Sequence, residues 1–328
     1  MGVLRTVICG KFFKATFSDL EVAKDFLTYF VPQPIIELID LTSLKLEKDS
    51  FVSHKLDENF TDLLFKTKIK DHPAYLHFLF EHKSYLSKNV SLQLLRYMLE
   101  IWSASQKEKP SDDLPMVIPI VIYHGDPIWT IPLKLGDLIN GYDDLPVDVQ
   151  KYAPDFEYVL YNVIDYQDTN FKVHVFLRIM FNLFRDIRKK GPKAILKTIF
   201  HAVDLLKQFT NQDTALQYLE TMMYYVFHAN QQVTNDKFHD IMGYIEQNYS
   251  EGSDRVMTLA EIFREEGKLE GQLELQIKNA IQLITKFVAP VPDQLEERIN
   301  QQDLATLDTI IMSIDEWKSL EEIEKILK

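Results

Sequence analysis

The predicted fold is organised around residues 60–84, which read FTDLLFKTKIKDHPAYLHFLFEHKS. Two apolar runs flank a polar turn at residues 70–73, a pattern that is typical of a β-hairpin. Asp62 lies near the start of the first predicted strand, and Glu81 and Lys83 lie at the end of the second. Because side chains alternate between the two faces of a strand, we expect Glu81 and Lys83 to share a face.

A turn centred between Asp71 and His72 would place Asp62 directly opposite Glu81. Directly opposed residues of an antiparallel pair share a face and lie within about 5.5 Å of each other. The sequence therefore predicts that two carboxylates and the Lys83 ammonium group converge on one small patch. This register is a hypothesis, because an error of one residue in the turn would break it.

Length and composition indicate a folded protein of about two domains. The chain has 328 residues, of which 46% are hydrophobic, and it contains no long low-complexity tract. Its single cysteine, Cys9, excludes an intrachain disulfide framework and fits a reducing compartment. No apolar run reaches about 18 residues and no signal-peptide pattern opens the sequence, so we expect a cytoplasmic protein without a membrane partner.

The net charge of −13 taken alone disfavours a nucleic-acid partner. The acidic residues, however, are unevenly distributed. Residues 111–170 hold 2 Lys or Arg and 11 Asp or Glu, whereas residues 1–110 hold 15 and 14. The segment that contains Asp62, Glu81 and Lys83 is therefore close to neutral, and its local charge does not exclude DNA.

Periodicity along the chain predicts an α/β domain followed by helices. Helical spacing runs over residues 12–29, with a helix start at Ser18-Asp19, and again over residues 87–106. The β-branched run at 115–124 is typical of a strand buried on both faces, and 156–164 predicts another strand. Residues 128–155 are expected to form loops with short helices. From residue 171 onward the pattern is helical, with two short final helices at 293–299 and 304–327.

We predict three regions on this basis. They are an α/β domain at residues 1–205, a helical extension at 206–252 and a helical C-terminal region at 253–328, with the boundary drawn at the polar break of residues 249–253.

The order helix, strand, hairpin with two acids and a lysine, helix, strand is that of a mixed-sheet α/β nuclease core. Phosphodiester hydrolysis uses a divalent cation to activate water and to neutralise the developing negative charge. Mg²⁺ prefers oxygen ligands and keeps several waters, so Asp62, Glu81 and the backbone carbonyl of His82 suffice. Lys83 can orient the attacking water. Charged residues on strands more often form a solvated face, but here the flanking strands are strongly apolar.

The helix that follows adds Gln93 and Tyr97, which are four residues apart and so share a face near the strand ends. His124 ends a buried strand, where α/β proteins place ligands, but a lone histidine at a turn is more often structural. Other enzyme classes leave no signature, since the chain has no P-loop, dinucleotide-binding glycine motif, nucleophile elbow or zinc spacing.

Several short motifs follow one another along the chain: KFFK at 11–14, DLTSLKL at 40–46, FTDLLF at 60–65, EHKS at 81–84, LLRYM at 94–98 and YHG at 123–125. In this order they resemble the Rpn family of recombination-promoting nucleases, within the PD-(D/E)XK nuclease superfamily, which implies that residues 1–205 form a nuclease-like domain. The similarity extends over residues 10–205, and such an ordered series is far more specific than the acid and lysine pattern alone.

This resemblance implies a restriction-endonuclease-like mixed sheet flanked by helices and a metal-dependent DNA endonuclease that promotes recombination. By match to the superfamily motif, Asp62 and Glu81 would be metal ligands, Lys83 the catalytic lysine and Gln93 a supporting residue. The cofactor would be Mg²⁺ or another divalent cation such as Mn²⁺ or Ca²⁺, and the partner DNA. Many relatives carry His-Asp where this chain has Cys9-Gly10.

Two alternatives remain open from the sequence. One is a catalytically degenerate nuclease fold that acts as an interaction protein, with a homodimer formed through the helical C-terminal region. The other is a DNA-binding transposition accessory that does not cut.

Overall fold

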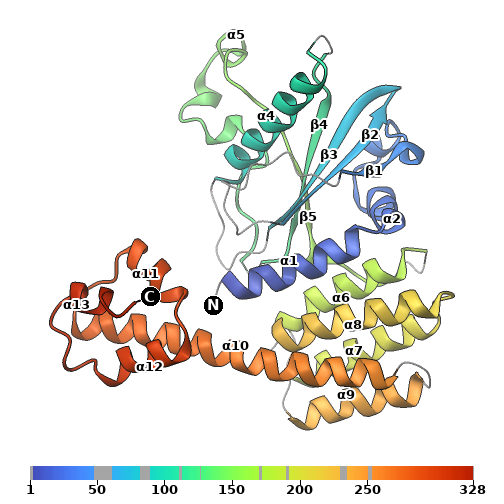
Figure 1. Cartoon of the computed structure of the whole chain (residues 1–328). Coiled ribbons are helices and arrows are strands. Elements are labelled where there is room, and N and C mark those ends of the chain that lie inside the picture. Colours follow the sequence, from blue (N-terminus) through green and yellow to red (C-terminus); the bar gives the residue numbers. More distant parts are fainter. Residues whose placement is uncertain are drawn as a thin grey trace.

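The computed structural model describes residues 3–47, 61–81, 89–110, 113–125, 127–169, 172–189, 192–229, 235–249 and 253–327. A five-stranded sheet with helices on its faces forms the first part of the chain, and helices alone form the remainder (Figure 1). No helix within these ranges is long and apolar enough to cross a membrane.

The sheet is mixed, and its strands follow one another in space in the same order as in the sequence. They are β1 (Lys45–Leu46), β2 (Thr61–Ile69), β3 (His72–Glu81), β4 (Met116–Tyr123) and β5 (Val159–Asn162). β1, β2 and β3 pair antiparallel, whereas β3, β4 and β5 pair parallel. The predicted α/β class is therefore confirmed. The restriction-endonuclease-like assignment stays a prediction.

The predicted register of the hairpin is wrong by two residues. Asp62 pairs with Leu79 rather than with Glu81, because the turn is centred between Lys70 and Asp71. Both turn residues have positive φ, 47° and 68°, as a two-residue type I′ hairpin turn requires. A shift of two residues, unlike a shift of one, does not exchange the faces of a strand. The corrected register therefore still predicts that Asp62 and Glu81 lie on the same face of the sheet.

Proline explains why this register forms. The residues that flank a two-residue turn form a hydrogen-bonded pair, in which the second residue donates its N–H. With the predicted register the donor would have been Pro73, which has no N–H. In the structure Ile69 and His72 flank the turn instead, and Pro73 pairs with Lys68 one position further along the strands.

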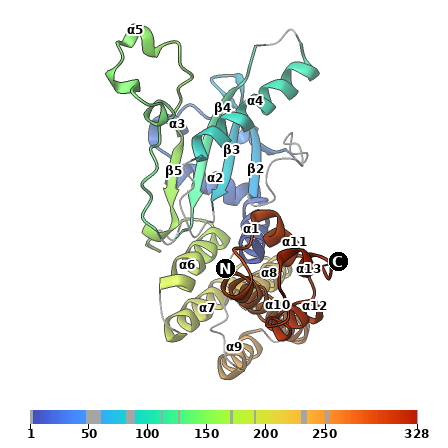
Figure 2. The same ribbon diagram turned by 90° about the vertical axis from the view of Figure 1, so that its left-hand side faces the viewer.

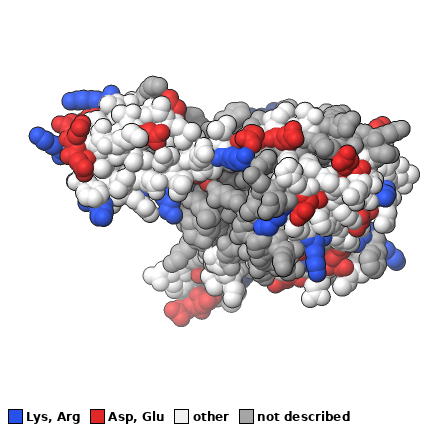
Figure 3. Space-filling model, turned by 90° about the horizontal axis from the view of Figure 1, so that it is seen from below, with Lys and Arg blue, Asp and Glu red and all other residues white. Residues whose placement is uncertain are grey.

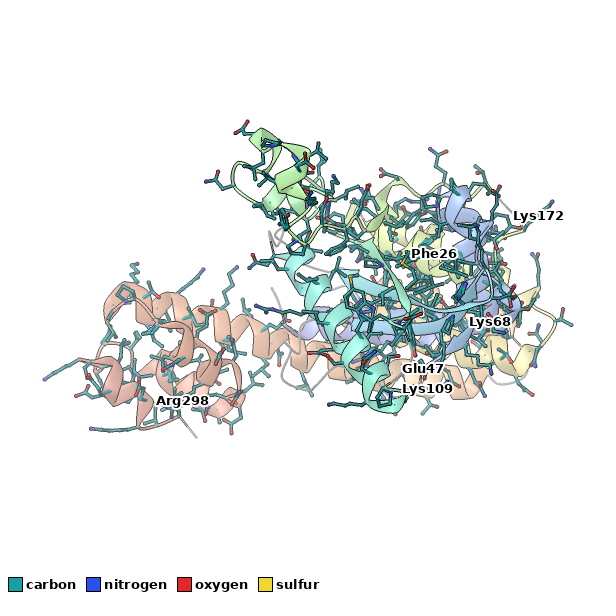
Figure 4. All side chains as sticks on the ribbon, turned by 90° about the horizontal axis from the view of Figure 1, so that it is seen from above. Phe26, Glu47, Lys68, Lys109, Lys172 and Arg298 are labelled. Carbon is teal, nitrogen blue, oxygen red and sulfur yellow. The ribbon has the colours of Figure 1, made fainter. Side chains whose placement is uncertain are left out.

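Two helices cover one face of the sheet at its lower end. α1 (Val3–Phe17) and α2 (Leu20–Phe30) are separated at Ser18-Asp19, and the Asp19 carboxylate accepts a hydrogen bond from the Glu21 N–H at 2.9 Å. This confirms the predicted helix start. Phe26 of α2 lies in the interior of this layer (Figure 4), in edge-to-face contact with Phe78 of β3 at 5.5 Å between ring centroids.

α4 (Val90–Glu108) covers the opposite face of the sheet (Figure 2). Its buried stripe packs on apolar side chains of β2, β3 and β4. Near its end, Trp102 donates a hydrogen bond from Nε1 to the Pro115 carbonyl at 2.8 Å, just before β4 begins. α4 therefore runs antiparallel to β3, and its first turn lies at the end of the sheet where β3 stops.

Short elements connect the sheet to the helices, as predicted for residues 128–155. They are α3 (Gln33–Ile36), η1 (Leu41–Ser43), η2 (Gly136–Leu138), η3 (Tyr142–Asp144), α5 (Val147–Gln150) and η4 (Val163–Asp165). The helices that follow are α6 (Val175–Lys189), α7 (Pro192–Lys207), α8 (Gln212–Ala229) and α9 (Asn235–Asn248). Residues of α6 to α9 share one hydrophobic core with α1, α2 and the sheet.

The last helices form a second core of their own. α10 (Ser253–Phe287) packs against α8 and then projects beyond it to α11 (Asp293–Asn300), α12 (Leu304–Met312) and α13 (Leu320–Glu324) (Figure 1). The predicted helix at 304–327 is wrong in one respect, because it is interrupted between α12 and α13. At this break Trp317 turns back and donates from Nε1 to the Ile310 carbonyl at 3.2 Å. The predicted domain boundaries stay predictions.

Candidate functional site

The carboxyl ends of three parallel strands meet at one edge of the sheet. Glu81 of β3, Tyr123 of β4 and Asn162 of β5 are register partners in this row. The first turn of α4 lies at the same edge, and so does the beginning of β2, because β2 runs antiparallel to β3. Open α/β sheets bind ligands beyond the carboxyl ends of their strands. This edge is therefore the candidate site.

The backbone brings the two predicted metal ligands to this edge. Since Asp62 pairs with Leu79, Glu81 is its diagonal neighbour, and such positions are separated by about 7–8 Å. The side chains of Asp62 and Glu81, and residues His82 and Lys83 altogether, lie outside the described part of the chain. Their predicted roles stay predictions. Among the side chains that the structure describes, no group of three or more His, Cys, Asp or Glu could hold a metal ion.

Gln93 is the predicted site residue whose side chain the structure describes. It is half-buried in the first turns of α4, and its Nε2 lies 3.5 Å from the Tyr97 hydroxyl. Tyr97 is buried, and its ring meets the His77 ring of β3 edge-on, with 4.8 Å between centroids. The prediction that Gln93 and Tyr97 share a face is confirmed. Gln93 thus lies over the sheet near the end of β3.

His124 has a structural role. Its ring is buried and stacks on Phe184 of α6, with 4.3 Å between ring centroids. Its Nε2 lies 2.6 Å from the Phe184 carbonyl oxygen. These contacts join the end of β4 to α6. They confirm the interpretation of this histidine as structural.

Gly125 follows His124 at a point where a side chain has no room. The Tyr123 hydroxyl donates to the Pro127 carbonyl at 2.7 Å, so the Tyr123 ring folds back over the backbone of Gly125. A Cβ atom at Gly125 would overlap the far end of that ring. The motif YHG therefore shapes the end of β4, and none of its three residues supplies a described metal ligand.

A polar network that the sequence analysis missed lies below the same edge, between η4, α6 and α7. The Asp168 carboxylate accepts from Arg178 Nε at 2.7 Å and from Asn182 Nδ2 at 2.9 Å. The Tyr166 hydroxyl also donates to it at 3.1 Å, and His201 Nε2 lies 3.3 Å away. Arg178 and Asn182 are four residues apart and are the two polar residues of the otherwise apolar stretch 175–184. Two polar residues at helical spacing within an apolar stretch were the signal that could have indicated this network.

Comparison with known proteins places this fold in a family. The sequence pattern of the family described as "Putative transposase, YhgA-like" matches residues 10–217, which is more than half of the chain. The chain belongs to the YhgA-like family. The matched residues include the whole sheet, α4 and the candidate site.

Curated relatives are similar over most of their length. The chain is 27% identical over 277 residues to the inactive recombination-promoting nuclease-like protein RpnE of Escherichia coli K12, which covers 83% of this chain and 88% of that protein. It is 26% identical over 263 residues to recombination-promoting nuclease RpnA of the same strain, covering 80% and 85%. No solved structure gives a significant match. The resemblance to the Rpn family is therefore confirmed.

Proposed function

We propose that this protein is a divalent-metal-dependent DNA endonuclease whose site lies at the edge formed by β2, β3 and α4. The observation that carries the proposal is the pairing of β2 with β3, which puts Asp62 and Glu81 on neighbouring strands one diagonal apart, beside the start of α4. Relatives named recombination-promoting nucleases support this assignment. Their names give the proposed biological outcome, which is DNA recombination.

The donor set fits Mg²⁺ by its chemistry. Two carboxylates and a carbonyl oxygen are hard ligands, and a magnesium ion needs only one or two carboxylates because it keeps several waters. Asp62, Glu81 and the His82 carbonyl would hold the ion, and Mn²⁺ or Ca²⁺ would compete for the same oxygens. When bound, the ion supplies an acidified water and neutralises negative charge on the phosphate.

The remaining predicted residues would act on the phosphate and the water. Lys83 would orient the attacking water and stabilise the charge that develops on the phosphate oxygens. Gln93 would use its amide, which already lies at the start of α4, to hold the water or a phosphate oxygen in position. All these groups come from one hairpin and the helix that follows it.

Surface charge indicates how DNA would be held. In the view from below, Lys and Arg side chains are interspersed with Asp and Glu among the described residues (Figure 3). A protein that neutralises few phosphates shows a shallow dependence of affinity on salt concentration. Because the chain as a whole also has a net charge of −13, we expect binding that relies on the site itself, with a salt dependence weaker than that of a strongly basic DNA-binding domain.

The deciding experiment is cleavage of supercoiled plasmid by purified protein with Mg²⁺, with Mn²⁺ and with EDTA. We expect nicking or cutting that requires the metal and falls by about 100-fold or more in Asp62→Asn. Asp71→Asn is the matched control, because Asp71 lies at the opposite end of the same hairpin and asparagine tolerates its positive φ. Equal cleavage by the wild type and Asp62→Asn would refute the proposal.

A non-catalytic interaction protein is the second candidate, favoured by a specific observation. One relative that covers 83% of this chain is named inactive. In addition, α10 exposes Leu269 and Leu275, which a partner helix or a second copy of the chain could cover. A stable oligomer without cleavage or metal-dependent stabilisation would support this candidate, whereas salt-sensitive DNA binding without cleavage would indicate a transposition accessory.

A further inference from the structure

Ser91 lies in the second position of α4 and is completely buried. In the part of the chain that the structure describes, its Oγ has no hydrogen-bond partner. Buried hydroxyl groups in native proteins nearly always have such a partner. A serine that leaves its hydroxyl unsatisfied in a buried helix position therefore calls for an explanation, since alanine would fill the same space without that penalty.

The position of Ser91 over the sheet can be derived from contacts along α4. Tyr97 meets His77 of β3, and Met98 packs with Leu64 of β2 and Tyr75 of β3. Ser91 precedes Met98 by seven residues, which is two turns, so it follows the same line over β2 and β3.

The axial distance from Tyr97 to Ser91 along α4 places Ser91 at the candidate site. Ser91 precedes Tyr97 by six residues, and this corresponds to about 9 Å of helix or about three residues of strand. Because α4 runs antiparallel to β3, Ser91 lies about three strand residues beyond His77, at the level of Leu79 to Glu81. Asp62 pairs with Leu79 at this level. Ser91 is therefore at the level of the two predicted metal ligands.

The start of α4 reinforces this placement. Asn89 caps the helix without a side-chain hydrogen bond, and the first turn contains no acidic residue. The first N–H groups of a helix have no acceptor within the helix, and helical Cβ atoms tilt toward the N-terminus. The Ser91 hydroxyl is thus directed toward a helix end whose first N–H groups are not capped by the Asn89 side chain or by an acidic residue of the first turn.

We propose that Ser91 is a positioning residue of the nuclease site and that its hydroxyl hydrogen bonds to a water of the metal's hydration shell. This inference rests on the proposed function. A water molecule fits a fully buried hydroxyl, whereas a DNA phosphate would need an open surface. Mg²⁺ retains several of its waters when protein carboxylates bind it. Mutation of residues that hydrogen bond to the ligands of a metal, without binding the metal themselves, typically lowers metal affinity by about 10–100-fold.

Metal binding in the absence of DNA tests the inference on the full chain. The melting temperature is measured against Mg²⁺ and Mn²⁺ concentration for the wild type, Ser91→Ala, Ser103→Ala and Asp62→Asn, because a bound metal stabilises the folded state. Ser103 is the matched control, since it lies on the same helix, is exposed and bonds only the Leu99 carbonyl at 2.6 Å.

We expect Ser91→Ala to need about 10–100-fold more metal for half of the stabilisation, with a metal-free melting temperature equal to or above that of the wild type. Ser103→Ala should match the wild type, and Asp62→Asn should not respond. An unchanged metal midpoint in Ser91→Ala, whatever its stability, would overturn the role of Ser91 alone. A wild type that neither responds to metal nor cuts DNA would overturn the proposed function, and the role of Ser91 with it.

Discussion

Asp168 is a partly buried carboxylate, with a side chain that is 14% exposed, and its ionisation contributes to the stability of the fold. Burial raises the pKa of Asp168, but hydrogen bonds from Arg178 and Asn182 outweigh burial, so the pKa lies below its usual value. The folded protein therefore binds this proton less readily than the unfolded chain. The resulting stabilisation is fully present above the unfolded pKa of about 4 and is lost as the pH falls through the folded pKa.

We predict that Asp168→Asn lowers the free energy of unfolding at pH 7 by about 3 kcal/mol, because it removes the carboxylate that pairs with the buried Arg178 guanidinium at 2.7 Å. The difference from the wild type should shrink as the pH falls below about 4, because Asp168 of the unfolded wild-type chain then binds a proton more readily than Asp168 of the folded protein. Thermal or urea unfolding between pH 3 and pH 7 measures both effects. The exposed Asp165→Asn serves as control, and a deficit that is constant across this range would contradict the assignment.

Gly125 lies directly against the ring of Tyr123, where a side chain has no room. Gly125→Ala should destabilise the protein by about 1–3 kcal/mol, because the new Cβ overlaps the Tyr123 ring, which is itself buried. Gly243 of α9 is the matched control, since nothing lies within 4 Å of a Cβ built there. In that helix Gly243→Ala should stabilise by about 0.5–1 kcal/mol. Denaturant unfolding of both variants checks the pair, and effects of equal sign would contradict this account.

At the scale of the element, the hairpin shows what the hydrophobic pattern can and cannot determine. The alternation of apolar residues fixes which face each strand residue occupies, and a shift of two residues preserves that alternation. The pattern in residues 60–84 therefore could not distinguish pairing of Asp62 with Glu81 from pairing with Leu79. The turn decides, and the information was local, because Pro73 cannot donate in the hydrogen-bonded pair that closes a two-residue turn.

The register can be tested with cysteine pairs on the hairpin. Lys66 is directly opposite Tyr75 in the structure, whereas the register predicted from the sequence would place Lys68 opposite Tyr75. Directly opposed Cα atoms are separated by about 4.5–5.5 Å, which suits a disulfide, and diagonal neighbours by about 7–8 Å, which does not. We predict that Lys66→Cys with Tyr75→Cys oxidises quantitatively and that Lys68→Cys with Tyr75→Cys stays reduced, and both pairs retain Pro73. Thiol titration or mass spectrometry distinguishes the two pairs. Oxidation of the second pair but not of the first would instead support the register in which Asp62 lies opposite Glu81.

Helices and strands with strong periodicity were predictable, and long-range polar contacts were not. The helix start at Asp19, the buried strand β4 and the helices after residue 171 follow from spacing and capping alone. The Asp168 network joins residues that are up to 33 positions apart, so the spacing of Arg178 and Asn182 alone could not indicate their partner. For the site, the sequence indicated the residue types and their edge of the sheet. The level of Ser91 depends on how α4 lies across the sheet, which only the fold provides.

In the whole molecule, the C-terminal helices have a hydrophobic core that is separate from those of the sheet. Among the described residues, a large core joins the sheet to α1, α2 and α6 to α9, and two smaller clusters lie between α4 and the sheet. The C-terminal core, which we call the small core, is formed within the C-terminal part of α10 and α11 to α13, and it includes Leu307 of α12 and Ile299 of α11. Arg298 belongs to this second group of helices, which stands apart from the sheet (Figure 4). Separate cores allow separate cooperative units, and these open with different free energies.

We predict that Leu307→Ala, which leaves a cavity in the small core, lowers local stability there by about 2–5 kcal/mol. Amide hydrogen exchange should accelerate in α11, α12 and α13 while β3 and β4 keep their wild-type protection, because the cavity does not contact the large core. Met312→Ala is the matched control, since Met312 lies at the end of the same helix and is 85% exposed. If plasmid cleavage belongs to the sheet edge, it should survive Leu307→Ala at the wild-type rate. Acceleration of exchange throughout the sheet would show instead that the two cores unfold as one unit.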